Sequence, residues 1–238
     1  TKGKMRYSKF TAPVKKGGRQ ATNQLSVVIP AAGTGRRMKS YGPKCLLRSK
    51  GDMSIIEQIV DNALNVYPMA DIIVVVGFEA DKVIQILSST TRIIENQLYN
   101  DTNVVESIRL ALNSIVTDSA LFIYGDLIFN VETIYNIADD KSCAIVDSKG
   151  NFKSEEIGVT IVDNKITNFA YGLETKWAQI IFLTGKELKI FRELCFDRKR
   201  NKMYPFEIFN LVIDRGGVIE ATEPKEMQIK EVDSLKDL

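Results

Sequence analysis

The stretch LSVVIPAAGTGRRMKSYGPK, residues 25–44, decides the fold class. It begins with a short apolar run, LSVVIP, and continues into a loop with three glycines, two arginines and two lysines. A short apolar run that ends in a Gly-rich turn is typical of a strand buried in a parallel sheet. Ligands of open α/β sheets bind at the carboxyl ends of such strands. We therefore expect an α/β protein with a ligand-binding loop after its first strand.

This loop matches neither of the two most common nucleotide-binding motifs. A dinucleotide-binding fingerprint requires a third glycine where Met38 stands, and Gly42-Pro43 interrupts the helix that should follow. A P-loop requires four residues between its glycines and then Lys-Ser/Thr, which are missing. Backbone N–H groups beside Arg36, Arg37, Lys39 and Lys44 suit a polyphosphate. An ordinary turn with solvated charges is the alternative.

Strand-like and helix-like segments alternate after this loop. Strands are expected at residues 71–78, 91–96 and 120–126, and helices at 54–66, 80–87 and 102–115, the first of these with a capping box of Ser54 and Glu57. From about Cys143 the pattern changes to a hairpin at 158–169 that turns at Asp163-Asn164, a strand at 178–183, helices at 185–194 and 205–215, and strands at 217–222 and 226–233. This order predicts a three-layer α/β/α, Rossmann-like fold with a mostly parallel sheet and an added antiparallel hairpin region, in one domain at residues 25–238.

Composition narrows the possible chemistry. The chain of 238 residues contains no histidine, which excludes Ser-His-Asp triads, His-ligated zinc and imidazole bases. Three cysteines without metal-ligand spacing favour a reducing cytoplasm over a disulfide framework. Catalysis by this chain would therefore depend on carboxylates, lysine, arginine, hydroxyls, backbone amides or a metal ion.

Residues 1–24 differ from the rest in charge. They hold seven lysines and arginines and no acidic residue, so all 30 acidic residues lie in the remainder. We expect a flexible basic extension, with a nucleic-acid-binding arm as the alternative. The sequence begins with Thr1 and stops soon after a helix is expected to start at Ser234, which is consistent with a fragment or one domain of a longer enzyme.

The segment AAGTGRRMKSYGPK resembles the signature loop of nucleotidyltransferases with a GT-A-like fold, written G-x-G-x-R, a spacer and Pro-Lys. The closest patterns are those of sugar-1-phosphate nucleotidyltransferases and phosphocholine cytidylyltransferases. FIYGDLIF resembles the family strand that ends in Gly-Asp, and EVDSLKDL resembles its segment Glu-hydrophobic-Asp-Ser/Thr-x-x-Asp. NDTNVVES resembles the stretch that lines the base and ribose. The resemblance covers roughly residues 25–238.

The resemblance implies the transfer of a nucleotidyl group from an NTP to a phosphorylated acceptor, with release of pyrophosphate. It implies catalytic roles for Arg37, which would bind the β- and γ-phosphates, for Lys44, between the reacting phosphates, and for Asp126. It implies Mg²⁺ as the cofactor, held by Asp126 and Asp233. The implied nucleotide-binding residues are Ala31, Ala32, Gly33, Thr34, Gly35, Gly77, Asn103 and Ser107. Asp126 as a turn residue and Asp233 as a helix N-cap are the structural alternatives.

The acceptor is expected to contact the second half of the chain. GLETKWAQIIFL resembles the Trp-Ala stretch beside the sugar in sugar-1-phosphate nucleotidyltransferases, which implies Glu174, Lys176, Trp177 and Gln179 as acceptor-binding residues. Tyr171 and Trp177 could alternatively face the quaternary ammonium of phosphocholine. Trp177 could also be a core residue. Methylerythritol phosphate is the weakest of the three acceptors, because the Gly-Asp and EVDS segments depart from that branch.

We expect a pyrimidine nucleotide, CTP or UTP, and a sugar 1-phosphate as substrates of a cytoplasmic, Mg²⁺-dependent enzyme without a membrane partner. A phosphocholine-type cytidylyltransferase is the first alternative. A non-catalytic nucleotide-binding regulatory domain is another, because fold alone does not fix function. The joint presence of Arg37, Lys44, Asp126 and Asp233 argues against that last alternative.

Overall fold

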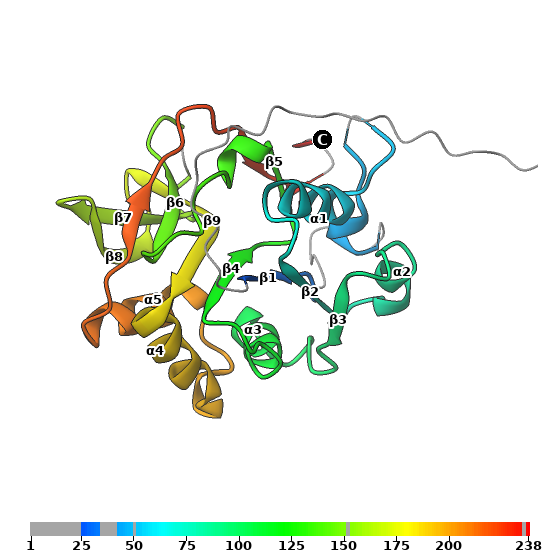
Figure 1. Ribbon diagram of the computed structural model, residues 1–238, viewed down its shortest axis with the longest axis horizontal. Coiled ribbons are helices and arrows are strands. Elements are labelled where there is room, and N and C mark those ends of the chain that lie inside the picture. The colour runs from blue at the N-terminus through cyan, green and yellow to red at the C-terminus, as the bar shows by residue number, and fades with distance from the viewer. Residues whose placement is uncertain (1–24, 34–41, 50, 151–152, 235–236) are drawn as a thin grey trace, which may run out of the picture.

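The computed structural model describes residues 25–33, 42–49, 51–150, 153–234 and 237–238. Its first half forms the predicted parallel sheet (Figure 1). The buried strand β1 (Leu25–Pro30) lies between β2 (Asp71–Val76) and β4 (Ser119–Ile123), and β3 (Arg92–Glu95) pairs with β2. All three pairings are parallel, as the alternation of strands and helices predicts.

The second half continues the same sheet with mostly antiparallel strands. The long strand β9 (Thr175–Thr184) runs antiparallel to β4 and to β6 (Cys143–Asp147). Strand β10 (Glu220–Thr222) pairs with β6 and with the hairpin of β7 (Ile157–Val162) and β8 (Lys165–Tyr171). The antiparallel part is thus larger than a single hairpin. Away from this sheet, β5 (Leu127–Phe129) pairs with β11 (Ile229–Glu231).

Helices cover both faces of the sheet, which gives the three layers (Figure 1). Because side chains alternate along a strand, Val27 and Ile29 of β1 pack in the core below α1 (Ile55–Val66) and α2 (Ala80–Ile84). Val28 packs on the other face with α3 (Val104–Leu112), α4 (Gly185–Phe196) and α5 (Pro205–Asp214). Short 3₁₀ helices occur at η2 (Lys44–Leu46), η3 (Val131–Thr133) and η4 (Arg198–Arg200).

Two local predictions are confirmed in detail. Ser54 caps α1 and forms the predicted capping box with Glu57, since each side chain bonds the other residue's backbone N–H. Asp163 and Asn164 both have left-handed φ angles, of 48° and 63°, in the turn between β7 and β8. A two-residue turn with positive φ at both positions matches the twist of the strands it joins.

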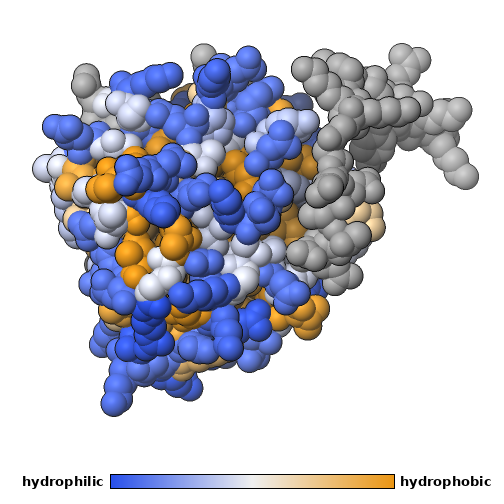
Figure 2. Space-filling model, turned by 60° about the vertical axis from the view of Figure 1, so that its left-hand side comes forward, coloured by the Kyte–Doolittle hydropathy of each residue, from blue (hydrophilic) through white to orange (hydrophobic). Residues whose placement is uncertain are grey.

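None of the helices among the described residues combines the length and the apolar character needed to cross a membrane. Figure 2 shows the side with β7, β8 and the late helices as mostly hydrophilic, interrupted by apolar patches. Tyr171 and Tyr204 are exposed, and both rings pack against Phe206.

Candidate active site

Three side chains from distant parts of the sequence meet beside the end of β4. The ammonium group of Lys44 lies 3.1 Å from Oδ2 of Asp126 and 3.3 Å from Oδ1 of Asp233. Lys44 opens η2, Asp126 stands between β4 and β5, and Asp233 follows β11. The pairing of β5 with β11 brings the two carboxylates together, and Val232 donates its backbone N–H to the Asp126 carbonyl at 2.9 Å.

The cluster is strongly electrostatic. Burial alone would lower the pKa of Lys44, but the charges and hydrogen bonds of Asp126 and Asp233 outweigh it and raise this pKa above its ordinary value. Lys44 is therefore a cation at neutral pH. Oδ1 of Asp126 is buried and has no hydrogen-bond partner among the described residues. An unsatisfied buried carboxylate oxygen is costly, so it favours the binding of a cation or a donor there.

The carboxylate of Asp237 holds the segment that carries Asp233. Its Oδ2 accepts hydrogen bonds from the backbone N–H groups of Asp233 at 2.9 Å and Ser234 at 2.6 Å, and from the Ser234 hydroxyl at 3.0 Å. These bonds, the backbone bond to Ser234 first, lower the pKa of Asp237. Asp237, rather than Asp233, thus binds the backbone N–H groups here, and the Asp233 carboxylate is left to pair with Lys44.

The predicted nucleotide side contains several close backbone contacts. Ala31 donates to the carbonyl of Val75 at 2.8 Å, and Phe78 donates to the carbonyl of Ala32 at 3.2 Å. A Cβ atom at Gly77 would lie 2.8 Å from the Ala32 carbonyl oxygen and 2.8 Å from Cβ of Tyr99, so only glycine fits. Gly33 has open space around its Cα. Arg37, Thr34 and Gly35 lie outside the described residues.

Asn103 and Ser107 occupy the start of α3. Asn103 stands at the N-cap position and donates its side-chain N–H to the carbonyl of Lys202, which links α3 to the segment after η4. Ser107 is buried and accepts a hydrogen bond from the Asn96 side chain at 3.0 Å. Both side chains therefore already have protein partners, so any contact they make with a nucleotide would be additional to these bonds.

A pocket of about 390 Å³ opens beside the Lys44 cluster. Two predicted acceptor-binding residues, Lys176 and Gln179, line it, as does Asp233. Lys176 contacts Glu156 at 2.5 Å and Glu231 at 3.5 Å, and Gln179 donates to Glu231 at 2.6 Å. Glu156 and Glu231 also line the pocket. The remaining lining residues are Leu127, Asp147, Lys153, Ala178, Ile229, Lys230, Ser234 and Asp237.

The other two predicted acceptor residues do not line this pocket. Trp177 is only 2% exposed, packs edge-on against Tyr124, Phe169 and Phe209, and donates its indole N–H to the Ile180 carbonyl. The Trp177 side chain thus lies in the core, as the structural alternative expected, and a role in acceptor binding stays a prediction. Glu174 is exposed in the turn between β8 and β9, outside the pocket lining.

The sequence analysis missed Glu231. It lies two residues before Asp233 and faces both Lys176 and Gln179. Burial, followed by the charges of Asp126 and Asp233, raises its pKa. The Glu-hydrophobic-Asp order of EVDSLKDL was the available signal. Within the described part of the chain, no three acidic or cysteine side chains lie close enough to hold a metal ion, and Asp126 and Asp233 are joined through their contacts with Lys44.

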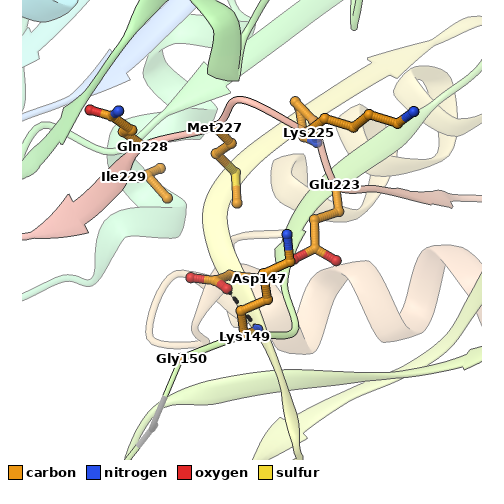
Figure 3. A pocket seen from close by; sticks show the side chains of 9 residues that line it. Asp147, Lys149, Gly150, Glu223, Lys225, Met227, Gln228 and Ile229 are labelled. Atoms are coloured by element: carbon orange, nitrogen blue, oxygen red, sulfur yellow. Dashed lines mark hydrogen bonds between the residues drawn. The ribbon is translucent and has the colours of Figure 1, made fainter.

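A second pocket of about 380 Å³ adjoins the first and shares Asp147 and Ile229 with it. Figure 3 shows Met227 pointing into this space above Asp147, and Lys149 and Lys225 at its sides. Asp147 accepts the backbone N–H of Lys149 at 3.0 Å. Glu223 accepts the backbone N–H and hydroxyl of Ser148 at 2.9 and 2.8 Å. The two pockets together extend away from Lys44.

The profile of the MobA-like NTP transferase domain matches residues 27–195. The chain belongs to this family. The matched range covers β1, the loop after it and Asp126, so the predicted nucleotidyltransferase relationship is confirmed. Lys44 and Asp126 lie within the matched range, whereas Asp233 lies beyond it.

Two curated relatives are bifunctional GlmU proteins, and each matches about a quarter of this chain. The bifunctional protein GlmU of Solibacter usitatus is 44% identical over 61 residues, which is 26% of this chain and 13% of that protein. The chain thus matches only a small part of this curated relative.

Solved structures share the fold of this domain along most of its length. The CTP:phosphocholine cytidylyltransferase of Streptococcus pneumoniae aligns with a TM-score of 0.73 and 17% identity, over 90% of this chain and 96% of that one. A putative glucose-1-phosphate thymidylyltransferase of Bacillus anthracis aligns with a TM-score of 0.73 and 19% identity, over 89% and 91%. At such identity the likeness shows the GT-A-like fold alone, which confirms the predicted fold class.

Proposed function

We propose that this chain transfers a nucleotidyl group from a pyrimidine NTP, CTP or UTP, to a phosphorylated acceptor of the sugar 1-phosphate type, with release of pyrophosphate. The observation that carries the proposal is the position of Lys44. Its ammonium contacts the carboxylates of Asp126 and Asp233. It lies where the parallel strands end, beside a polar pocket. Family membership supports the reaction class.

Electrostatics explain why such a reaction uses this set of residues. An oxygen of the acceptor phosphate attacks the α-phosphorus of the NTP, and both groups carry negative charge. Positive groups must offset that repulsion and the charge that develops in the transition state. Lys44 would do this between the two reacting phosphates, and Arg37 would bind the departing pyrophosphate. No general base is required, because a phosphate monoester is largely ionised at neutral pH.

The residues present fit Mg²⁺. This ion prefers oxygen ligands and binds through one or two carboxylates together with substrate phosphates, and Asp126 and Asp233 supply such a pair. The unpartnered buried Oδ1 of Asp126 adds a free oxygen ligand. When bound, Mg²⁺ would neutralise phosphate charge and polarise the phosphoryl oxygens. Asp237 would keep Asp233 in place through its backbone bonds.

The pocket beside Lys44 supports a hydroxyl-bearing acceptor. Charged and amide side chains, among them Glu156, Lys176, Gln179 and Glu231, form most of its polar lining. Such groups hydrogen-bond hydroxyls, whereas a quaternary ammonium is bound by aromatic faces. No aromatic residue belongs to this lining in the described chain, and Tyr171 packs on Phe206 outside it. A sugar phosphate is therefore favoured over phosphocholine.

A matrix of the four NTPs against several phosphorylated acceptors, with detection of pyrophosphate, tests the proposal. We expect release in Mg²⁺ with CTP or UTP and a sugar 1-phosphate. Pyrophosphate release with phosphocholine but with no sugar 1-phosphate would contradict the proposed acceptor and support the proposed reaction. Binding of an NTP without pyrophosphate release from any acceptor would favour a nucleotide-binding regulatory domain.

A further inference from the structure

The ammonium group of Lys44 lies where a metal cation would be expected. It contacts one oxygen of Asp126 and one of Asp233, at 3.1 and 3.3 Å, and its side chain is only 18% exposed. Two carboxylates held this close repel one another unless a cation stands between them. In the described structure, Lys44 is that cation.

This position conflicts with the role that the reaction needs. Lys44 is assigned to the two reacting phosphates, but here its N–H groups bond Asp126 and Asp233. The same two carboxylates are the ones assigned to Mg²⁺, and oxygens that face an ammonium are not available to the ion. The ammonium and the ion therefore cannot occupy the space between Asp126 and Asp233 together.

Lys44 is also an incomplete partner for this space. It reaches Oδ2 of Asp126, whereas Oδ1 of the same carboxylate is buried and has no partner in the described part of the chain. A divalent ion with its waters and phosphate ligands offers more bonds and twice the charge of one ammonium. The Lys44 ammonium neutralises the carboxylates but leaves one of their oxygens unsatisfied. A cation that binds the carboxylates more tightly can therefore displace this ammonium.

We propose that Lys44 is the resting counter-ion of Asp126 and Asp233, and that a divalent cation displaces its ammonium from them. The competition between the two cations does not depend on the reaction. The further step, in which the released ammonium moves to the phosphates, rests on the proposed function. If the cation frees Lys44 and thereby tightens the binding of a ligand to that lysine, linkage requires the ligand to tighten cation binding by the same factor. Nucleotide phosphates would have that effect, so the metal would bind well only together with the nucleotide.

A lysine of the neighbouring pocket, Lys230, provides a matched control. The ammonium of Lys230 bonds the Asp237 carbonyl at 2.6 Å, and no contact joins it to Asp126 or Asp233 in the described residues. Lys230→Met removes one positive charge from this part of the protein, as Lys44→Met does. It therefore separates the general effect of a lost charge from the effect of vacating the position between the carboxylates.

Mn²⁺ binding to the full chain without nucleotide, measured by calorimetry, tests the proposal. We expect Lys44→Met to bind Mn²⁺ at least about fivefold more tightly than the wild-type chain. Lys44→Arg keeps a cation in place and should resemble the wild type, and Lys230→Met should gain clearly less than Lys44→Met. Adding Asp126→Asn to Lys44→Met should remove the gain, which locates the bound ion.

Equal Mn²⁺ affinity of Lys44→Met and Lys44→Arg would overturn the proposal, as would an equal gain in Lys230→Met. If Lys44→Met does not fold, Lys44→Gln takes its place. The wild-type chain gives a second readout, since the Nζ resonance of Lys44 must shift on addition of Mg²⁺ while that of Lys230 stays. A chain with this competition but no pyrophosphate release would keep the inference and contradict the proposed function.

Discussion

The ammonium of Lys44 lies 3.1 Å from the carboxylate of Asp126, although 82 positions separate the two residues in the chain. The contact joins the loop after β1 to the end of β4, two adjacent parallel strands. Their carboxyl ends meet at one edge of the sheet, where α/β folds bind ligands. The ion pair therefore marks the centre of the candidate active site.

Asp126→Asn should lower pyrophosphate release by about 10²–10³-fold, because it removes a charge that pairs with Lys44 and that we propose as a metal ligand. The fold should persist, since the amide has nearly the shape of the carboxylate it replaces and Asp233 still pairs with Lys44. Steady-state kinetics and the thermal midpoint measure the two effects. Asp140→Asn, at an exposed position, is the control. Wild-type turnover in Asp126→Asn would exclude a catalytic role.

Gly77→Ala should destabilise the fold by about 1–3 kcal/mol, because its Cβ would meet the Ala32 carbonyl and Tyr99 at 2.8 Å. Gly33→Ala is the matched control, since nothing lies within 4 Å of a Cβ there. Urea unfolding of both variants measures the difference in the free energy of unfolding. Equal stability of the two variants would show that Gly77 does not need to be glycine.

Sequence alone predicted the parts of the structure with a local physical signal. The buried run at Leu25–Pro30, the Ser54–Glu57 capping box and the Asp163-Asn164 turn each carry such a signal, and each is present. The three-residue strand β5 is too short to show a hydrophobic period. The helix expected at residues 80–87 ends at Ile84.

Prediction of the site was limited by contacts that have no local signal. The sequence motifs indicated Lys44, Asp126 and Asp233 as site residues, and the structure places the three side chains together. Their chemical roles stay predictions. Gln179 has a left-handed φ of 60° inside β9, near a register shift against β6. Such a bulge re-aims a side chain, here toward Glu231, and depends on tertiary pairing. In the sequence, Trp177 looks the same whether its side chain binds a ligand or packs in a core.

Asp237→Asn should make the free energy of unfolding change less with pH in the acid range. The folded-state pKa of Asp237 lies below its ordinary value of 3.8, chiefly because of the Ser234 backbone bond. Its stabilising effect is therefore complete above the unfolded-state pKa and is lost as pH falls through the folded-state pKa. At pH 7 we expect a loss of about 0.5–1 kcal/mol, the low end for a capping bond in partial solvent.

Urea unfolding of the wild type and Asp237→Asn between pH 2 and pH 7, the range in which Asp titrates, gives this pH dependence directly. The two free energies of unfolding should converge as the pH falls. A difference that stays constant over the whole range would mean that the Asp237 charge does not hold the Asp233 segment.

Glu231→Gln should have the opposite dependence. Burial and the charges of Asp126 and Asp233 raise the folded-state pKa of Glu231, so ionisation disfavours the folded state. This carboxyl group supports folding fully below its unfolded-state pKa and loses that effect as pH rises through the folded-state pKa. We therefore expect Glu231→Gln to be more stable than the wild type at pH 7, with the gain shrinking toward pH 4.

Activity should change in the other direction. Glu231 lines the pocket that we propose for the acceptor and bonds Gln179, so Glu231→Gln should raise the KM for the acceptor more than the KM for the NTP. Unfolding curves and steady-state kinetics on the same preparation measure both. A variant that is less stable at pH 7 and has an unchanged acceptor KM would contradict this account of Glu231.

The central claim is that an acceptor phosphate attacks the α-phosphorus of an NTP at Lys44. Phosphorus NMR of the chain with UTP or CTP, Mg²⁺ and a sugar 1-phosphate labelled with ¹⁸O in its phosphate measures this directly. We predict equal amounts of pyrophosphate and a diphosphate-linked product whose bridging oxygen carries the label, both absent with Lys44→Met. Formation of inorganic phosphate and a nucleoside diphosphate, or an unlabelled bridge, would contradict it.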